Sequence, residues 1–288
     1  MNQTKKKNPL KRLLSMRGMG QVVTVTIGLI VLLVAFALIN PNFWSPTNRT
    51  NLLRQIAPIL IIGIAQSYVL ITGNIDLSIG SVVGMSTMVA ATLMSKGIMS
   101  PIPALLVTLL CCLLIGVLNG LLVAKFKLPP FIATLGTMTV ARGIAQLVNG
   151  NYNTDSIMKF YPEAAQTFKN VFYYGKTLGL YNGIWIAIIL WIVFNFLLSK
   201  TRTGRYIYAT GSNIDAARLS GVNVVSTTVI AYVVSAFCSF VVGIITCATV
   251  GQGTMDAGNS YEMYAVAASV IGGVSTLCLL YTSPSPRD

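Results

Sequence analysis

Histidine is absent from the 288 residues, and charged residues are scarce at 9% of the chain. The lack of histidine excludes His-based catalysis and removes the commonest metal ligand. Soluble domains carry about 25% charged residues, whereas this chain is 54% hydrophobic with a mean hydropathy of +0.73. The composition therefore predicts a polytopic membrane protein in which each span satisfies its own backbone hydrogen bonds as a helix.

Acidic residues are few as well, seven against 20 basic ones, which gives a net charge of +13. Such an excess can indicate nucleic-acid binding, but six of the basic residues lie just ahead of the first apolar run, at positions 5–7, 11, 12 and 17. A cluster there is typical of an orientation signal that keeps the amino terminus in the cytoplasm. The run 22–39 is unbroken and lacks a small-residue cleavage site, so we expect a retained span, not a signal peptide, and no nucleic-acid partner.

Cysteine gives little information on function. Four of the five cysteines lie inside apolar segments without paired ligand spacing, which predicts small buried hydrophobic residues. The fifth, Cys278, opens the tail 278–288, CLLYTSPSPRD, which resembles a translated sequencing adapter. We exclude this tail from fold reasoning as non-native and expect the natural chain to be truncated near Leu277.

Apolar runs predict the fold class as all-α, a polytopic transmembrane helical bundle with about eight spans. The runs are 22–39, 56–73, 77–95, 102–124, 130–148, 183–198, 226–248 and 263–277. With 1–21 inside, segment 199–224 is cytoplasmic and segment 149–182 is periplasmic. Basic residues then number twelve inside and six outside, which agrees with the positive-inside rule.

Two charged residues within the apolar regions are candidate pathway residues. Asn74, Asp76 and Ser78 lie between two spans with no room for an ordinary loop, which predicts a broken helix at membrane depth that lines a cavity. The alternative is that Asp76 caps the next span. Arg142, near the middle of 130–148, either lines the pathway, pairs with Asp76 or extends from a span end.

The polar, basic segment 199–224 predicts a short helix on the cytoplasmic face. Ser212 or Asn213 can cap it, Asp215 and Arg218 share one face, and Gly221 can end it. A helix this short is marginal in water. It must rest on the membrane surface or on a soluble partner, and its mixture of small, apolar and charged residues favours the partner.

Four ordered motifs resemble the permease subunits of bacterial ribose, galactoside and xylose ABC importers. They lie at 73–81, 129–138, 203–221 and 261–273. The resemblance implies one transmembrane permease domain over 1–277, about ten spans in a full-length member, and a location in the bacterial inner membrane. It also implies three partners: a second permease copy or homologue, a periplasmic sugar-binding protein, and an ABC ATPase with two fused nucleotide-binding cassettes.

The residue patterns and the resemblance together give the candidate site residues. The substrate pathway would include Asn74, Asp76, Ser78, Arg142 and Glu262, although the chain has Glu262-Met-Tyr where the family commonly has Glu-Leu-Asp. Coupling to the ATPase would involve Arg205, Asn213, Asp215, Ala216, Arg218, Leu219, Ser220 and Gly221. We expect no catalytic residue and no cofactor in this subunit, with ATP and Mg²⁺ held by the partner.

Two other function classes compete with this interpretation. An ion-coupled secondary sugar transporter would use Asp76 or Glu262 as its coupling carboxylate. An intramembrane hydrolase is disfavoured because the chain lacks histidine and a Gly-x-Ser-x-Gly elbow. No phosphate-binding Gly-x-x-x-x-Gly-Lys-Ser/Thr motif occurs either, as expected for a membrane subunit.

Overall fold

The computed structural model of the chain describes residues 19–274, so the basic terminus and the tail 278–288 lie outside the described residues. A helix forms in each of the eight apolar segments. These helices are α2 (Met19–Ile39), α3 (Pro46–Ile71), α4 (Ile79–Ser95), α5 (Pro101–Ala124), α6 (Pro130–Leu147), α8 (Asn182–Lys200), α11 (Val224–Val250) and α12 (Tyr261–Ile271).

Four of them, α3, α5, α8 and α11, are long and apolar enough to cross a membrane. Helix α3 begins ten residues before the apolar run that predicts it, because Ser45 caps it and Pro46 occupies its first turn. The structure therefore agrees with an all-α membrane protein, while the count of eight spans stays a prediction.

The connections between the spans contain more structure than the sequence predicts. Segment 149–182 contains helix α7 (Pro162–Lys169), the π-helical turn η1 (Asn170–Tyr174) and a small antiparallel hairpin of β1 (Lys176–Thr177) and β2 (Leu180–Tyr181). Segment 199–224 contains two helices, α9 (Arg202–Ser212) and α10 (Ile214–Leu219), where one was expected.

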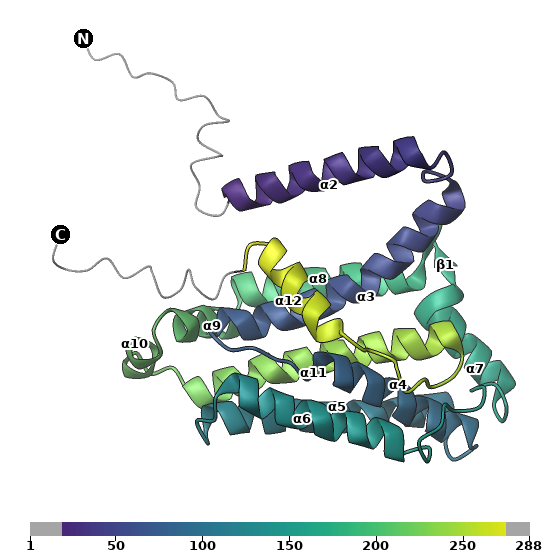
Figure 1. The fold of residues 1–288 in the computed structure, drawn as a ribbon. Coiled ribbons are helices and arrows are strands. Elements are labelled where there is room, and N and C mark those ends of the chain that lie inside the picture. The colour runs from purple at the N-terminus through teal and green to yellow at the C-terminus, as the bar shows by residue number, and fades with distance from the viewer. Residues whose placement is uncertain (1–18, 275–288) are drawn as a thin grey trace, which may run out of the picture.

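Helix α11 is the centre of the bundle and packs against α3, α4 and α5. Its contact with α5 is close because Gly116 and Gly120 face it: a Cβ at Gly116 would lie 2.8 Å from the carbonyl oxygen of Tyr232. Small residues at this spacing let helix backbones approach closely in lipid. Helix α2 lies apart from this core and connects to it through α3 (Figure 1).

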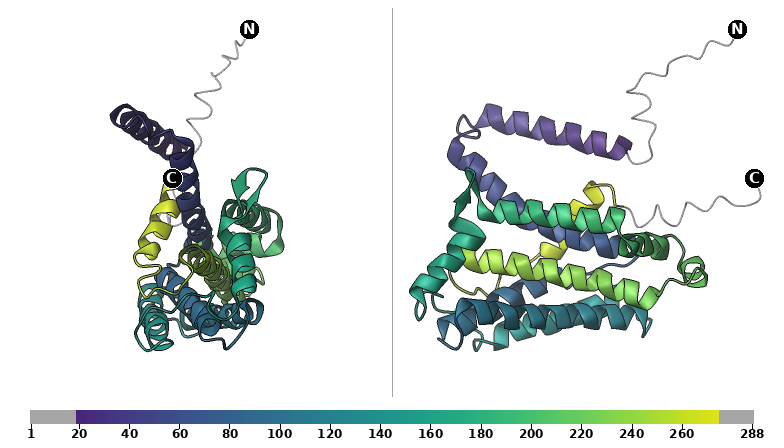
Figure 2. Two further views of the ribbon diagram at one scale, coloured as in Figure 1. Left: turned by 90° about the vertical axis from the view of Figure 1, so that its right-hand side faces the viewer. Right: turned by 180° about the vertical axis from the view of Figure 1, so that it is seen from behind.

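The two large connections lie at opposite ends of the bundle. Helices α9 and α10 and the amino-terminal end of α2 are at one end, and α7 and β1 are at the other, in views from the front and from behind (Figures 1 and 2). The helices of segments 149–182 and 199–224 thus lie at opposite ends of the bundle, and the assignment of these ends to the two sides of the membrane stays a prediction.

Two helices begin inside the bundle instead of at its ends. Segment 72–78 separates α3 from α4, and segment 251–260 separates α11 from α12. The starts of α4 and α12 meet, since a Cβ added to Gly80 would collide with the carbonyl oxygen of Gly258 and with the Glu262 carboxylate. Glycine is required at position 80 for this close approach.

Candidate functional site

Asp76 lies at the interruption between α3 and α4 and is 2% exposed. Its Oδ1 accepts hydrogen bonds from the Ser78 amide at 2.9 Å and from the Ser78 hydroxyl at 2.6 Å. Its Oδ2 accepts from the Ser235 hydroxyl of α11 at 2.7 Å. Both carboxylate oxygens therefore have partners, as a buried carboxylate requires.

The network continues into two further helices. Asn119 of α5 donates from Nδ2 to Ser78 Oγ at 2.9 Å, and Thr137 of α6 donates to Asn119 Oδ1 at 2.6 Å. Tyr232 of α11 donates to the Ile75 carbonyl oxygen at 3.0 Å. These bonds connect the non-helical segment 72–78 to α5, α6 and α11, so that its backbone keeps one conformation.

The structure also locates the other residues of this segment. The Asn74 amide donates to Thr72 Oγ1 at 2.8 Å and is partly buried. Ser78 is the N-cap residue of α4, but its side chain forms no capping hydrogen bond. Its backbone amide donates to the carboxylate of Asp76, two residues earlier, in an Asx-type turn. Asp76 thus accepts from the Ser78 amide without being the N-cap residue of α4, and its role in the pathway stays a prediction.

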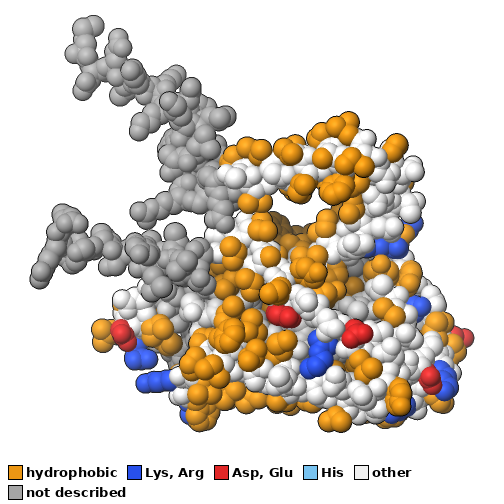
Figure 3. Space-filling model, in the orientation of Figure 1, with side chains coloured by type: hydrophobic (Ala, Val, Ile, Leu, Met, Phe, Trp, Pro, Cys, Tyr) orange, Lys and Arg blue, Asp and Glu red, His pale blue; other side chains and the backbone are white. Residues whose placement is uncertain are grey.

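A polar cavity of about 520 Å³ lies between α4, α6 and α12. Arg142 and Glu262 line it together with hydroxyl and amide side chains; the full lining is Ser81, Met138, Thr139, Arg142, Gly143, Gln146, Asn259, Ser260 and Glu262. Figure 3 shows acidic and basic side chains close together in the middle of this face, among largely hydrophobic or uncharged surface. Asn74, Asp76 and Ser78 do not line this cavity.

Arg142 is anchored by backbone oxygens. Its Nη1 donates to the carbonyl oxygens of Met255 at 2.8 Å and Ala257 at 3.0 Å. In residues 19–274 the ion pairs are Asp155–Lys159 and Asp215–Arg218, so Arg142 does not pair with Asp76. Glu262 and Asp256 lie close enough to interact with the Arg142 charge electrostatically. Arg142 thus lines the cavity and fixes the segment before α12.

The cavity combines hydrogen-bond donors and acceptors with both signs of charge, in a region that the sequence predicts to lie within the membrane, where polar groups are costly. Hydroxyl, amide, guanidinium and carboxylate groups together can bind a small polyhydroxylated molecule from several sides. Over residues 19–274 no three His, Cys, Asp or Glu side chains gather in a way that could hold a metal ion. The volume is within the range of about 300–1,000 Å³ that is typical of small-molecule sites.

At the cytoplasmic end predicted from charge, α10 is a capped and exposed helix. Asn213, not Ser212, is the cap: its Oδ1 accepts from the Ala216 amide at 2.9 Å. Asp215 and Arg218 form an exposed pair at 3.7 Å, and Leu219 is 90% exposed. Arg205 of α9, Ser220 and Gly221 are exposed too, and Gly221 ends the helix with φ +83°.

One residue of α10 is buried. Ala217 is 4% exposed, whereas the other residues of α10 are exposed. The Val222 amide donates to the Ala217 carbonyl oxygen at 3.0 Å and closes the end of the helix. The short helix thus presents a charged and apolar surface outward.

Residues 48–283 match the model of a family described as the permease component of the branched-chain amino acid transport system. The chain belongs to this family. It is 39% identical over 254 residues to a ribose import permease protein of Haemophilus influenzae, covering 87% of this chain and 76% of that one. The galactofuranose transporter permease protein of Escherichia coli is 35% identical over 278 residues, with 93% and 78% covered.

A third relative is named for a different sugar. The galactose/methyl galactoside import permease protein of Salmonella typhimurium is 33% identical over 263 residues, covering 85% of this chain and 77% of that one. No solved structure matches the chain. The family membership establishes the chain as a permease component of an import system, which is a transport subunit.

Several residues of the site were missed by reasoning from sequence. The partners in the Asp76 network are single polar residues inside apolar helices: Ser235, Asn119 and Thr137. The free-energy cost of a polar side chain in lipid is the one signal that could have identified them as site residues from sequence. Gln146 and Asn259 of the cavity have no local signature. They become neighbours only because segment 251–260 folds back against α4 and α6.

Proposed function

We propose that this permease component is the membrane-spanning subunit of an ATP-driven monosaccharide importer and that the sugar passes through the cavity between α4, α6 and α12. The observation that carries the proposal is the lining of this cavity by Arg142, Glu262, Gln146 and hydroxyl groups. A sugar that leaves water needs replacement hydrogen bonds for each hydroxyl group, and such groups supply them. The names of the relatives support a sugar as the cargo.

The exposed helix α10 is the proposed docking site for the ATPase. Its outward residues Asp215, Arg218 and Leu219 have no partner surface within the described chain other than each other. A six-residue helix is marginal without further contacts. The ATPase, which we propose to contain two fused cassettes and to bind ATP and Mg²⁺, would cover this surface.

The proposal includes the finer topology. All eight helices of the predicted spans would lie in the bacterial inner membrane, with α9 and α10 in the cytoplasm and segment 149–182 in the periplasm. A periplasmic binding protein would deliver the sugar to the latter face, and a second permease copy or homologue would complete the pathway. The bias of basic residues toward one end supports this orientation.

Uptake measurements test the function. Cells that lack other sugar permeases would express the chain with a double-cassette ATPase and a binding protein encoded beside it, and uptake of radiolabelled D-ribose, D-galactose and D-allose would be measured. We expect uptake of at least one sugar to require ATPase activity and to fall in Glu262→Gln, with exposed Glu163→Gln as the matched control. Uptake that persists without the ATPase and stops when the ion gradient is dissipated would instead support secondary transport.

A further inference from the structure

The outer connection 149–161 is fastened directly to segment 251–260, which forms one wall of the cavity. Thr154 and Gly253 exchange two hydrogen bonds: the Thr154 amide donates to the Gly253 carbonyl oxygen at 3.0 Å, and the Gly253 amide donates to Thr154 Oγ1 at 2.8 Å. Thr154 is 4% exposed, so water does not compete easily for these bonds. A side-chain hydroxyl thus acts as the acceptor for a buried backbone donor.

Two more bonds connect the same segments. Asn153 Oδ1 accepts from the Met255 amide at 2.9 Å, and the Ile157 amide donates to the Gly251 carbonyl oxygen at 3.0 Å. On the opposite side, Arg142 holds the carbonyl oxygens of Met255 and Ala257. The backbone of segment 251–257 is therefore held from the outer connection and from the cavity at once.

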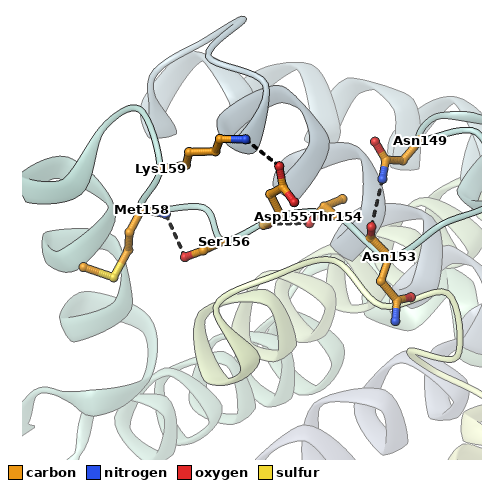
Figure 4. Close-up of polar contacts among 7 residues, drawn as sticks. All are labelled: Asn149, Asn153, Thr154, Asp155, Ser156, Met158 and Lys159. Atoms are coloured by element: carbon orange, nitrogen blue, oxygen red, sulfur yellow. Dashed lines mark hydrogen bonds and ion pairs between the residues drawn. The ribbon is translucent and has the colours of Figure 1, made fainter.

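The outer connection has its own internal bonds. The Asn149 amide donates to the carbonyl oxygens of Tyr152 and Asn153, and Lys159 pairs with Asp155 at 2.7 Å. Figure 4 shows Asn149, Asn153, Asp155 and Lys159 along one loop beside the segment that leads from α11 to α12. The Thr154 hydroxyl donates in turn to the Asp155 carbonyl oxygen, so the acceptor of the Gly253 amide has a fixed orientation.

Segment 251–260 needs this restraint because part of its backbone is strained. Ser260, which lines the cavity and is the N-cap residue of α12, has φ +63° in the left-handed region. A residue with a Cβ is held there at a cost of about 1 kcal/mol or more and persists only where the surroundings determine it. The outer bonds restrain the same segment, whose last residue, Ser260, is the N-cap residue of the helix that contains Glu262.

We propose that Thr154 and Asn153 are positioning residues that hold the wall of the cavity, and with it Arg142 and Glu262, from the outer face. The inference rests on the proposed function, because it gives the cavity its role as the sugar site. The geometry carries it: Thr154 bonds both backbone groups of Gly253, and Asn153 accepts from the amide of Met255, whose carbonyl oxygen Arg142 binds. Thr154 and Asn153 do not line the cavity.

A labelling experiment tests this without any transport assay. In a cysteine-free background, Ala257→Cys places a thiol at a position that is 7% exposed. We expect Thr154→Val to raise the rate at which a charged methanethiosulfonate reagent modifies this thiol about fivefold or more. The variant leaves the buried Gly253 amide without its acceptor, and the cost of an unsatisfied buried amide shifts the equilibrium toward an open segment by about this factor. Thr154→Ser keeps the hydroxyl and should restore the slow rate.

Controls separate this outcome from general disruption. Thr177→Val removes an exposed hydroxyl bond at the end of β1, outside both the outer connection and segment 251–260, and should leave the rate unchanged. Asn259→Cys, already exposed, should react quickly in every background. If Thr154→Val prevents folding, exposed Asn153→Ala provides the same test through the Met255 amide. The proposal would be overturned if neither Thr154→Val nor Asn153→Ala changed the modification rate of the thiol introduced by Ala257→Cys. This outcome does not depend on whether a sugar is transported.

Discussion

Replacing Asp76 by alanine tests whether the buried network fixes the interruption between α3 and α4. The substitution leaves three donors without their acceptor: the Ser78 amide, the Ser78 hydroxyl and the Ser235 hydroxyl. The hydroxyl groups can rotate toward other acceptors, but the amide cannot. One unsatisfied buried donor costs about 1–3 kcal/mol, and each displaced hydroxyl bond adds about 0.5–1.5 kcal/mol.

The expected loss of stability is therefore about 2 kcal/mol or more. At roughly 2–4 °C per kcal/mol for a chain of this size, the apparent unfolding temperature should fall by at least about 4 °C. The assay is thermal unfolding of the detergent-solubilised protein, followed by the loss of the monodisperse peak in size-exclusion chromatography. Asp76→Asn keeps one acceptor oxygen and should fall between the parent and Asp76→Ala.

Asp155→Ala is the matched control, because Asp155 is an aspartate with its side chain 68% exposed. Its replacement should leave the unfolding temperature within experimental error. Equal unfolding temperatures for Asp76→Ala and Asp155→Ala would refute the structural role of the network, and Asp76 would then be a candidate for a functional role alone.

Three further perturbations test other parts of the structure. Arg218→Glu should weaken co-purification of the ATPase while the chain remains in the membrane, and normal coupling in that variant would contradict docking at α10. Gly80→Ala should lower folded yield because its Cβ collides with the segment before α12, whereas Gly136→Ala, with nothing within 4 Å of the new Cβ, should not. The hydrogen bond from Lys159 holds the pKa of Asp155 below its ordinary value, so the ion pair is lost as the pH falls through that lowered pKa. The variant Lys159→Ala should raise the pKa of Asp155, measured by NMR of the carboxyl group. Between pH 6 and 8 the ion pair should not change.

The helices could be predicted from sequence because uncharged runs of sufficient length have few other options in lipid. The polar start of α3 was missed because Arg49 and Arg54 interrupt the run, although Ser45 followed by Pro46 is a helix-start signal. Helix α9 was missed for a related reason. Its sequence is polar and basic, and only the Thr201 cap, which accepts from the Gly204 amide, marks its start.

The interruption at 72–78 was predicted from its polar residues, but the partners of Asp76 were not. Ser235 lies 159 residues away in the chain, and nothing local indicates that it will face Asp76. Segment 251–260 gave no signal of its own because its glycines resemble those of an ordinary loop. Gly253 and Gly258 are required instead by close packing against α4, where a Cβ at Gly253 would lie 2.9 Å from that of Ala91.

The central claim is that sugar passes through the cavity between α4, α6 and α12, and cysteine protection at Asn259 tests it most directly. Asn259→Cys in a cysteine-free background would be modified by a charged methanethiosulfonate reagent in membranes that contain the ATPase and the binding protein. The account predicts that a transported sugar with ATP slows this modification and that a sugar that is not transported leaves it unchanged. An unchanged rate during active sugar uptake would contradict the account.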